Sequence, residues 1–486
     1  MLYLVVMALG LVAASAAAGQ PKFRASLLEA RSTESIYCDL DADGLEDILL
    51  RDRNHISVFY QDPSVGFNPR PDTEFDLAKA PGVLWSAALG GKGSTLLLAT
   101  SNGVSELCFT NRTTSPVWRP LIRQATVIPA GMEREPSSVV RFPLSVGRTN
   151  EPPLILLPVA GQLEVWQRRS EWQAVQKLTG VAEAHVWPMV RAPGYGRVLE
   201  LNLSVGELNG DGYEDLMVRR VQPNGEHTYR FFPQRPDGTF ASEPVMSYTE
   251  APDPDSWLCW VDVNRDGRPD LVKGIASGEP WFLPGTQSRK VLVGVYVADA
   301  QGRIPARPQY VFRKSDAMAV VPVTDIDGDG YPDLALGSAS ADTREEVRQM
   351  ITAKQFPLTL KLHFYRPGIG FAATPDCQAL ATFGLDQRSL SLAGPNAEYL
   401  QRVGNFYGDF DGDGKKDLLV RESSDEISVY RFISREQGFS RERLVRFDCG
   451  DVVDGFAVRD LNGDGISDLV VRTQKPNSVK VFTSYR

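Results

Sequence analysis

The stretch DFDGDGKKDLLV, residues 409–420, combines four aspartates, two glycines and an apolar run within twelve positions. Asp409, Asp411 and Asp413 alternate along a turn, so their side chains can converge on one side of it. Gly414 permits the chain to reverse, because glycine adopts backbone conformations that other residues avoid. Calcium takes roughly six to eight oxygen ligands from flexible loops of this kind. The stretch therefore predicts a calcium-binding loop that leads directly into a buried strand.

The loop differs from the calcium loop of an EF-hand. An EF-hand needs a bidentate glutamate at its twelfth position, between two helices. Here the twelfth residue is Val420, and the flanking segments have the pattern of strands. The simpler alternative is an aspartate-rich turn whose side chains bond only to their own backbone.

Five further segments follow the same template, Asp-x-(Asp or Asn)-x-Asp-Gly-x-x-Asp, with one glutamate at the first position. They are DLDADGLEDILL from Asp39, ELNGDGYEDLMV from Glu207, DVNRDGRPDLVK from Asp262, DIDGDGYPDLAL from Asp325 and DLNGDGISDLVV from Asp460. Six copies in register favour metal binding over isolated acidic turns. Such self-similarity along a chain is typical of repeat architectures, in which each copy forms one structural unit.

We expect each loop to bind calcium through its side chains at positions 1, 3, 5 and 9 and its backbone carbonyl at position 7. The expected metal ligands are Asp39, Asp41, Asp43, Leu45, Asp47, Glu207, Asn209, Asp211, Tyr213, Asp215, Asp262, Asn264, Asp266, Arg268, Asp270, Asp325, Asp327, Asp329, Tyr331, Asp333, Asp409, Asp411, Asp413, Lys415, Asp417, Asp460, Asn462, Asp464, Ile466 and Asp468. The loops from Asp39, Asp325 and Asp409 carry four carboxylates, whereas the other three carry three and an asparagine. Because affinity rises with ligand charge, we expect tighter binding in the first group. Glu207 departs from the template at the first position, where its side chain is longer than that of aspartate.

The spacing of the repeat predicts eight units. Successive loops start 168, 55, 63, 84 and 51 residues apart, and 168 is three times 56. The first gap therefore has room for two units without carboxylates, and residues 86–100 and 141–159 show the same strand-turn-strand pattern. Each unit has the pattern of four short strands separated by polar turns, which is typical of a β-propeller blade. Seven blades is the alternative, if one of the two silent units is an insertion.

The two ends of the chain suggest a closed ring. The final unit stops after its third strand, SVKVFTSYR. Residues 22–30, KFRASLLEA, resemble the fourth-strand segment GFSRERLVR at 438–446. An N-terminal strand that completes the last blade leaves no open sheet edge. We therefore expect an all-β propeller of eight four-stranded blades over residues 19–486, closed by this N-terminal strand.

The beginning of the chain predicts export. The first 18 residues, MLYLVVMALGLVAASAAA, carry no charge and end in an Ala-x-Ala pattern. They predict a secretory signal peptide over 1–18 and a secreted, extracellular or periplasmic protein. No later apolar run reaches the roughly 20 residues that span a bilayer.

Composition narrows the class of partner. A net charge of −9 argues against a nucleic-acid partner, which needs basic surfaces. The five cysteines lack metal-ligand spacing, so we expect small buried hydrophobic side chains rather than a defined disulfide framework.

The segments VVPVTDIDGDGYPDLALGSA and RVGNFYGDFDGDGKKDLLV resemble FG-GAP repeats, also called VCBS-type repeats. The resemblance implies a calcium-binding propeller similar to those of integrin α-subunits and of secreted bacterial proteins. The chain departs from the integrin pattern where Gly-Ala-Pro is expected, since it has Gly337, Ser338 and Ala339 there. The resemblance covers the mature chain and indicates the type of blade rather than the function.

An insertion at residues 338–357 accounts for the 84-residue interval between the loops from Asp325 and Asp409. Val347, Met350 and Ile351 fall at helical spacing within it. We expect a short amphipathic helix that packs on the face opposite the calcium loops.

Four tryptophans form the second feature outside the loops, and all lie just before or within expected innermost strands. The expected ligand-binding residues are Trp85, Trp187, Trp257 and Trp260. Their rings could stack on a sugar or a peptide in a central pocket. Packing between blades is the alternative role.

These observations favour a non-enzymatic binding or adhesion module in which up to six calcium ions stabilise the blades. The expected partner is a protein or a glycan. The alternative is a polysaccharide lyase or hydrolase built on the same propeller. Against an enzyme, the four histidines are scattered and the sequence contains no Gly-x-Ser-x-Gly, His-Glu-x-x-His or phosphate-binding motif. We therefore assign no catalytic residue.

Overall fold

The computed structural model describes residues 21–485 except 33, 53, 78–82, 88–92, 110–111, 113–115, 129–138, 142–144, 149–150, 182–183, 189–196, 254–255, 278–289, 316–322, 339–351, 353–354, 385–403 and 476–477. The predicted signal peptide lies outside the described residues. So does nearly all of the segment for which we expect a helix. The ends of the insertion that are described, Ser338 and residues 355–357, belong to strands.

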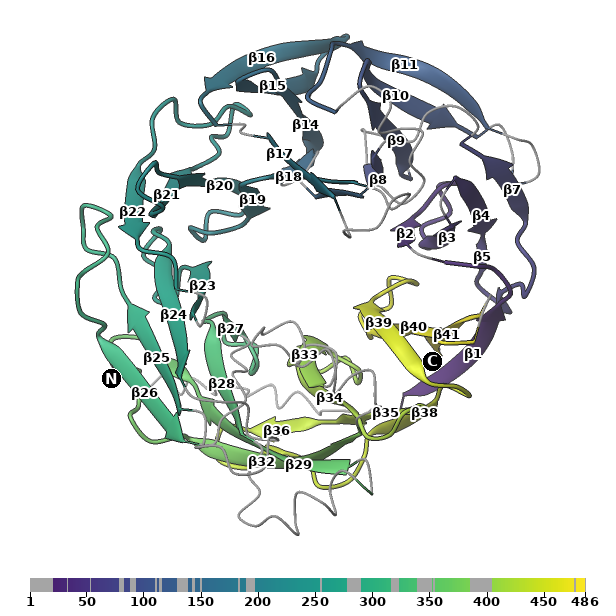
Figure 1. The fold of residues 1–486 in the computed structure, drawn as a ribbon. Coiled ribbons are helices and arrows are strands. Elements are labelled where there is room, and N and C mark those ends of the chain that lie inside the picture. The colour runs from purple at the N-terminus through teal and green to yellow at the C-terminus, as the bar shows by residue number, and fades with distance from the viewer. Residues whose placement is uncertain are drawn as a thin grey trace, which may run out of the picture.

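The described residues form eight four-stranded antiparallel sheets arranged in a ring, which is a β-propeller (Figure 1). Blade 1 contains β2 (Glu34–Cys38), β3 (Asp47–Asp52), β4 (His55–Phe59) and β7 (Thr73–Asp76); blade 2 contains β8 (Val83–Ala87), β9 (Thr95–Thr100), β10 (Gly103–Cys108) and β11 (Val117–Arg123). Blade 3 contains β13 (Ser145–Arg148), β14 (Glu151–Val159), β15 (Gln162–Arg168) and β16 (Trp172–Thr179); blade 4 contains β19 (Leu203–Gly206), β20 (Asp215–Val221), β21 (His227–Phe232) and β22 (Met246–Glu250).

The second half of the ring repeats this plan. Blade 5 contains β23 (Ser256–Val261), β24 (Asp270–Ser277), β25 (Lys290–Tyr296) and β26 (Tyr310–Ser315); blade 6 contains β27 (Val323–Thr324), β28 (Asp333–Ser338), β29 (Gln355–His363) and β32 (Cys377–Gly384). Blade 7 contains β33 (Gly404–Gly408), β34 (Asp417–Arg421), β35 (Glu426–Tyr430) and β38 (Val445–Asp448); blade 8 contains β39 (Val453–Arg459), β40 (Asp468–Thr473), β41 (Val479–Tyr485) and β1 (Lys22–Leu28). The predicted eight blades are confirmed.

The N-terminal strand closes the ring as expected. β1 pairs antiparallel with β41, from Lys22 opposite Tyr485 to Leu28 opposite Val479. The last blade thus takes three strands from one end of the chain and its outer strand from the other. The ring has no gap at this point, where Figure 1 places β1 beside β41.

The two units without carboxylates are blades 2 and 3. Residues 86–100 contribute the end of β8 and all of β9, and residues 141–159 contribute β13 and β14. A blade therefore forms here without the acidic loop, because the apolar second strands are retained. Leu96 and Leu97 of β9 are fully buried, as are Leu154 and Ile155 of β14.

The antiparallel order gives the propeller two unlike faces. The loop between the first and second strands and the connection between the third and fourth strands lie on one face, here called the loop face. Small two-stranded hairpins occupy that connection in three blades: β5 (Gln61–Asp62) with β6 (Gly66–Phe67), β30 (Tyr365–Arg366) with β31 (Gly370–Phe371), and β36 (Phe432–Ser434) with β37 (Gly438–Phe439). The hairpins between second and third strands lie on the opposite face.

One sheet does not belong to a blade and was not expected from the sequence. β12 (Val139–Arg141) pairs parallel with β18 (Arg197–Leu201), which pairs antiparallel with β17 (Ala184–Pro188). The segments come from either side of blade 3 along the chain. Figure 1 shows β17 and β18 on the inner side of the ring.

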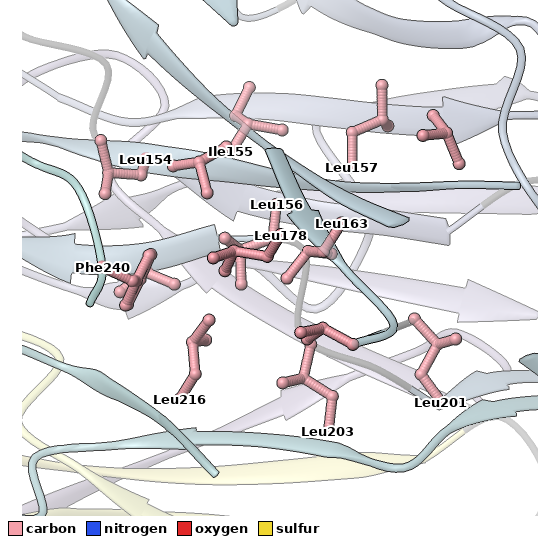
Figure 2. Close-up of a cluster of buried hydrophobic side chains, with 14 of the residues drawn as sticks. Leu154, Ile155, Leu156, Leu157, Leu163, Leu178, Leu201, Leu203, Leu216 and Phe240 are labelled. Carbon is pink, nitrogen blue, oxygen red and sulfur yellow. The ribbon is translucent and has the colours of Figure 1, made fainter. Parts of the chain in front are cut away.

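The core lies between neighbouring blades. All five residues of β34 are buried, because the second strand of a blade is covered by a neighbour on each side. The largest cluster centres on β14 and β15 and includes Leu156, Leu163 and Phe240 (Figure 2). Continuous apolar runs of this kind are typical of strands that are buried on both faces.

All five cysteines are unpaired, and three of them, Cys38, Cys377 and Cys449, are buried. Burial of these three agrees with the expected role as small hydrophobic side chains, whereas Cys108 and Cys259 are partly buried. Burial raises the pKa of the Cys377 thiol to about 12, so this sulfur stays protonated and behaves as a hydrophobic group. Within the described residues, no helix combines the length and apolar character that crossing a membrane requires.

Candidate metal centres

All six acidic loops connect the first strand of a blade to the second, in blades 1, 4, 5, 6, 7 and 8. The loops of neighbouring blades are joined through their backbones. The N–H of Lys416 donates to the carbonyl of Ile326 at 2.8 Å, and the N–H of Ser467 donates to the carbonyl of Asp409 at 2.7 Å. The N–H of Glu46 likewise reaches Leu461 of blade 8 at 2.7 Å. In each pair the eighth residue of one loop bonds to the start of the loop in the preceding blade.

The ninth residue of every loop is a fully buried aspartate at the start of the second strand. It bonds both to the loop before it and to the end of the third strand. These residues are Asp47, Asp215, Asp270, Asp333, Asp417 and Asp468, each 0% exposed. Oδ2 of Asp417 accepts the N–H of Phe410 in the loop at 2.7 Å, and Oδ1 accepts the N–H of Phe432 beyond the third strand at 3.1 Å. The other five make the same two kinds of bond. The ninth aspartate is therefore a clamp between the loop and the third strand.

Burial also changes the acidity of these clamps. Burial raises the pKa of Asp417 to about 7, against the opposing effect of the two N–H donors, and Asp411 and Asp409 nearby add to the rise. Burial likewise raises the pKa to about 7 for Asp47, Asp215, Asp270 and Asp468, and to about 8 for Asp333. Nearby positive charge opposes such shifts. A cation bound in the loop would therefore keep these buried carboxylates ionised.

The first and fifth residues hold the turn. Asp409 accepts the N–H of Gly412 through Oδ1 at 2.7 Å and that of Gly414 through Oδ2 at 2.7 Å. Asp413 accepts the N–H of Lys415 at 2.9 Å. Gly414 has a φ of 86°, which explains why glycine stands at this position of the turn. An ionised carboxylate has about four acceptor sites, so these bonds leave capacity for a metal ion.

The other loops repeat this turn. The first aspartate also accepts the N–H of the sixth-position glycine in the loops from Asp39, Asp262, Asp325 and Asp460. Glu207 Oε1 accepts the N–H groups of Asn209 at 3.1 Å and of Gly210 at 2.5 Å, at the two positions that also donate to Asp409 Oδ1 in its loop. The N–H of every expected carbonyl ligand at position 7 donates to the fifth aspartate: Leu45, Tyr213, Arg268, Tyr331, Lys415 and Ile466.

Carboxylate oxygens converge in three of the loops. Atoms within 4.8 Å of one another come from Asp39, Asp41 and Asp43, from Asp325, Asp327 and Asp333, and from Asp409, Asp411 and Asp417. These are the three loops with four carboxylates. Hard oxygen ligands at this separation suit a cation such as calcium.

A guanidinium group lies against each of these three clusters. Arg112 of blade 2 crosses to blade 1, where its Nε lies 2.5 Å from Asp41 Oδ2 and its second nitrogen 3.3 Å from Asp43 Oδ2. Arg435 of blade 7 pairs in the same way with the third and fifth aspartates of the loop from Asp325. The clusters therefore attract positive charge from the neighbouring blade.

The third cluster takes its arginine from its own blade, where Arg431 pairs with Asp411. Loops with asparagine at position 3 are held differently. Asn209 donates its amide to Asp211 at 3.0 Å, as the corresponding asparagine of the loop from Asp262 does to its fifth aspartate. Asn462 donates to the carbonyl of Ser484 at 2.8 Å.

Comparison with known proteins bears on these repeats directly. A family model described as FG-GAP-like repeat matches residues 208–272 and 409–471, and a second, described as FG-GAP repeat, matches 318–348. The chain carries FG-GAP repeats. The matched segments contain the acidic loops of blades 4 to 8, apart from Glu207 itself. The loop from Asp39 lies outside the matches, but its turn and its buried clamp at Asp47 give it the geometry of an FG-GAP loop.

Similarity outside the FG-GAP models is weak. A solved structure concerned with the recognition of non-reducing terminal N-acetylglucosamine by an Agrocybe aegerita lectin is 11% identical, with a TM-score of 0.37. The match covers 73% of this chain and 80% of the other. Among curated proteins, none matches this FG-GAP chain significantly in sequence.

Two of the four tryptophans line one cavity. Trp257 and Trp260 lie in β23, the innermost strand of blade 5, and both line a cavity between blades 4 and 5. Trp85 lies in β8, the innermost strand of blade 2. Trp187 lies in β17, so its expected place in an innermost blade strand is wrong. β17 belongs instead to the additional three-stranded sheet, and the side chains of Trp85 and Trp187 lie outside what the structure describes.

Proposed function

We propose that this FG-GAP chain is an exported calcium-binding propeller that acts as a non-enzymatic binding or adhesion module. In this proposal up to six calcium ions are structural and occupy the loops on the loop face. The observation that supports it most is the convergence of three carboxylates within 4.8 Å in each of three loops. Close like charges repel, and a cation bound between these carboxylates would offset that repulsion.

The residues of each loop have distinct roles in this proposal. The side chains at positions 1, 3 and 5 and the carbonyl at position 7 supply the oxygens that face the ion. The ninth aspartate adds a further carboxylate oxygen, which in the loops from Asp325 and Asp409 lies within 4.8 Å of those of the first and third aspartates. It also keeps its bonds to two backbone N–H groups and holds the loop against the third strand. Calcium supplies the positive charge that offsets the repulsion between these carboxylates.

Export provides the calcium that such sites need. The uncharged N-terminal segment is typical of a secretory signal peptide. Sites in extracellular modules bind calcium with dissociation constants of about 10⁻⁴ to 10⁻³ M. At millimolar calcium each site would then stabilise the fold by roughly 1 kcal/mol. Six sites would contribute about 6 kcal/mol, comparable to the total stability of an ordinary domain.

The binding role is assigned to the face of the ring that does not carry the acidic loops. The repeated carboxylates are committed to holding the hairpins, which leaves the opposite face of the ring for a protein or glycan partner. Many unrelated functions use the propeller fold, so the partner must be found from a site rather than from the fold.

Thermal unfolding of the full chain tests the proposal. We expect the melting temperature to fall by about 6 °C when a chelator replaces millimolar calcium, from the entropy of unfolding of a chain this long. A melting temperature that does not respond to the chelator contradicts the calcium assignment. Release of reducing ends or unsaturated products from a polysaccharide panel would contradict the non-enzymatic role and support a lyase or hydrolase.

A further inference from the structure

A cavity of about 740 Å³ lies between blade 4 and the innermost strand of blade 5. Met217, Arg219 and Tyr229 line it from blade 4, and Trp257 and Trp260 line it from β23. Sites for small molecules usually enclose about 300–1,000 Å³ and combine aromatic walls with a few polar groups. The cavity has the size and the composition of such a site.

The polar part of the cavity lies away from the acidic loops. In blade 4 the loop end of the sheet is marked by Gly206 opposite Asp215. Arg219 lies four positions further along β20, and His227 begins β21 at the other end, opposite Val221. A ligand held by these groups would therefore approach from the opposite face and leave the calcium loops undisturbed.

The packing between blades 4 and 5 is unusually sparse. Its cluster has only three buried members, Met217, Phe231 and Met246, and is the smallest among the described residues. By contrast, the cluster around Leu156 and Leu163 fills its space with aliphatic side chains (Figure 2). This interface retains an open space with aromatic walls.

One wall is an indole ring supported by a glycine. Trp257 lies flat on Gly274 of β24, so that a Cβ at position 274 would lie 2.1 Å from Trp257 Cε2. Trp260 packs beside Tyr229, with ring centroids 5.8 Å apart. The indole nitrogens of both tryptophans are buried in the protein, without a hydrogen-bond partner among the described residues. What the two side chains offer a ligand in the cavity is therefore their ring surface rather than their N–H groups.

The charged groups around the cavity are already balanced. Glu250 pairs with Lys273 at 2.6 Å. The guanidinium of Arg219 donates to Asn202 Oδ1 at 2.7 Å, and Asp253 supplies a carboxylate on the same lining. The two carboxylates offset the two cations, so the site has no net charge with which to select an ion. It offers donors and acceptors to an uncharged ligand.

We propose that this cavity binds a neutral saccharide, with a pyranose ring stacked on Trp257 and its hydroxyls bonded to Arg219 and Glu250. A pyranose has an apolar C–H face for an aromatic wall and hydroxyls that can both accept hydrogen bonds from, and donate them to, polar side chains of the lining such as Arg219 and Glu250. A charged ligand would leave its charge without a partner in this site. The inference rests on the proposed binding role and names its ligand class and its place.

Titration of the full chain in calcium with a panel of neutral oligosaccharides tests the proposal, with tryptophan fluorescence and calorimetry as readouts. We expect saturable binding of at least one neutral sugar. Trp257→Ala should weaken it at least tenfold, which corresponds to about 1.4 kcal/mol. Gly274→Ala should have a similar effect, because the added methyl group displaces the indole into the cavity. Trp118→Ala is the matched control, since Trp118 is a partly buried indole of blade 2 outside the cavity, and should bind normally.

The outcomes separate this inference from the proposed function. The inference is overturned if no neutral sugar binds, if only uronic-acid or cationic ligands bind, or if Trp257→Ala and Gly274→Ala bind as the wild type does. A chain that melts in a calcium-dependent way but binds no sugar loses only this inference. A chain whose melting ignores calcium loses the calcium proposal, whatever the sugar panel shows.

Discussion

The loops from Asp39, Asp325 and Asp409 differ from those from Glu207, Asp262 and Asp460 at the third position. The first group has aspartate there and the second has asparagine. In the first group an arginine from outside the loop pairs with the extra carboxylate. In the second group the asparagine amide donates a hydrogen bond within the blade. The residue at position 3 is therefore stabilised in two ways. In the first group an arginine balances the charge of the aspartate, whereas in the second group the uncharged asparagine needs no counter-charge.

The comparison teaches how charge is balanced in a repeat. An extra carboxylate makes a loop a better calcium site, since ligand charge tunes affinity. It also makes the loop more dependent on a counter-charge when calcium is absent. The arginines meet that need, but they occupy the oxygens that a metal ion would use. Arginine and calcium should therefore compete for the third-position aspartate in every loop of the first group. In the second group the described ion pairs include one such arginine, Arg268, which pairs with the fifth-position Asp266.

The largest effect should come from the clamp that both groups share. Asp417→Asn places an amide NH₂ against one of two backbone N–H groups that the carboxylate accepts. A buried donor without an acceptor costs about 1–3 kcal/mol, and here the backbone N–H and the new NH₂ both lack one. We therefore expect the free energy of unfolding to fall by about 2–4 kcal/mol. Chemical denaturation in chelator measures it. Asp215→Asn, in the second group, should cost as much, and a large difference between the two would break the comparison.

The second largest effect should come from exchanging the residue at position 3 between the two groups. Asp327→Asn converts the loop from Asp325 to the second type, and we expect its calcium affinity to fall by about tenfold with the lost ligand charge. Asn264→Asp makes the reverse change and should raise affinity in blade 5. Calorimetric titration should show one tight site fewer in the first variant and one more in the second. Unchanged numbers of tight sites in both variants would refute the role of position 3.

A smaller effect should come from removing the competing arginine. Arg435→Gln should lower the stability of the calcium-free chain by about 1 kcal/mol, because a partly exposed ion pair contributes little more. In calcium the same variant should bind the ion more tightly at the loop from Asp325. Arg307→Gln, an exposed arginine with no ion pair among the described contacts, is the control. Effects of the same sign with and without calcium would contradict competition.

The smallest effect concerns the one glutamate at position 1. Glu207 Oε1 accepts from the backbone at positions 3 and 4, as Asp409 Oδ1 does, but its side chain is one methylene longer. Glu207→Asp should remove that extra length and raise calcium affinity in blade 4 by about threefold, a modest gain within the second group. The thermal shift between calcium and chelator measures it. A weaker response than in the wild type would show that the longer side chain suits this loop.

Much of the architecture could be predicted from the sequence because the repeat is local. Each acidic loop and the apolar run after it are contiguous, and the 168-residue gap is a multiple of the repeat length, which located blades 2 and 3. The closing strand was found because residues 22–30 resemble other fourth strands. The buried clamp at position 9 was less clear, since a sequence does not show that Asp417 faces inward toward Phe432.

The contacts that the sequence missed join distant segments. Arg112 lies 71 residues from Asp41, and Arg435 lies 108 residues from Asp327. Each arginine precedes the fourth strand of the blade after the loop it contacts, a signal that becomes readable once the blade order is known. The sheet of β12, β17 and β18 has no repeated motif, and its parallel pairing around blade 3 follows from tertiary packing.

Calcium binding by the chelator-stripped full chain tests the central claim most directly. Calorimetric titration with calcium chloride, together with the bound metal counted by native mass spectrometry, should find up to six ions per chain in two classes. Three tight sites belong to the loops from Asp39, Asp325 and Asp409, and the weaker sites belong to the others. A chain that binds no calcium, or that binds it in one uniform class, would contradict the account.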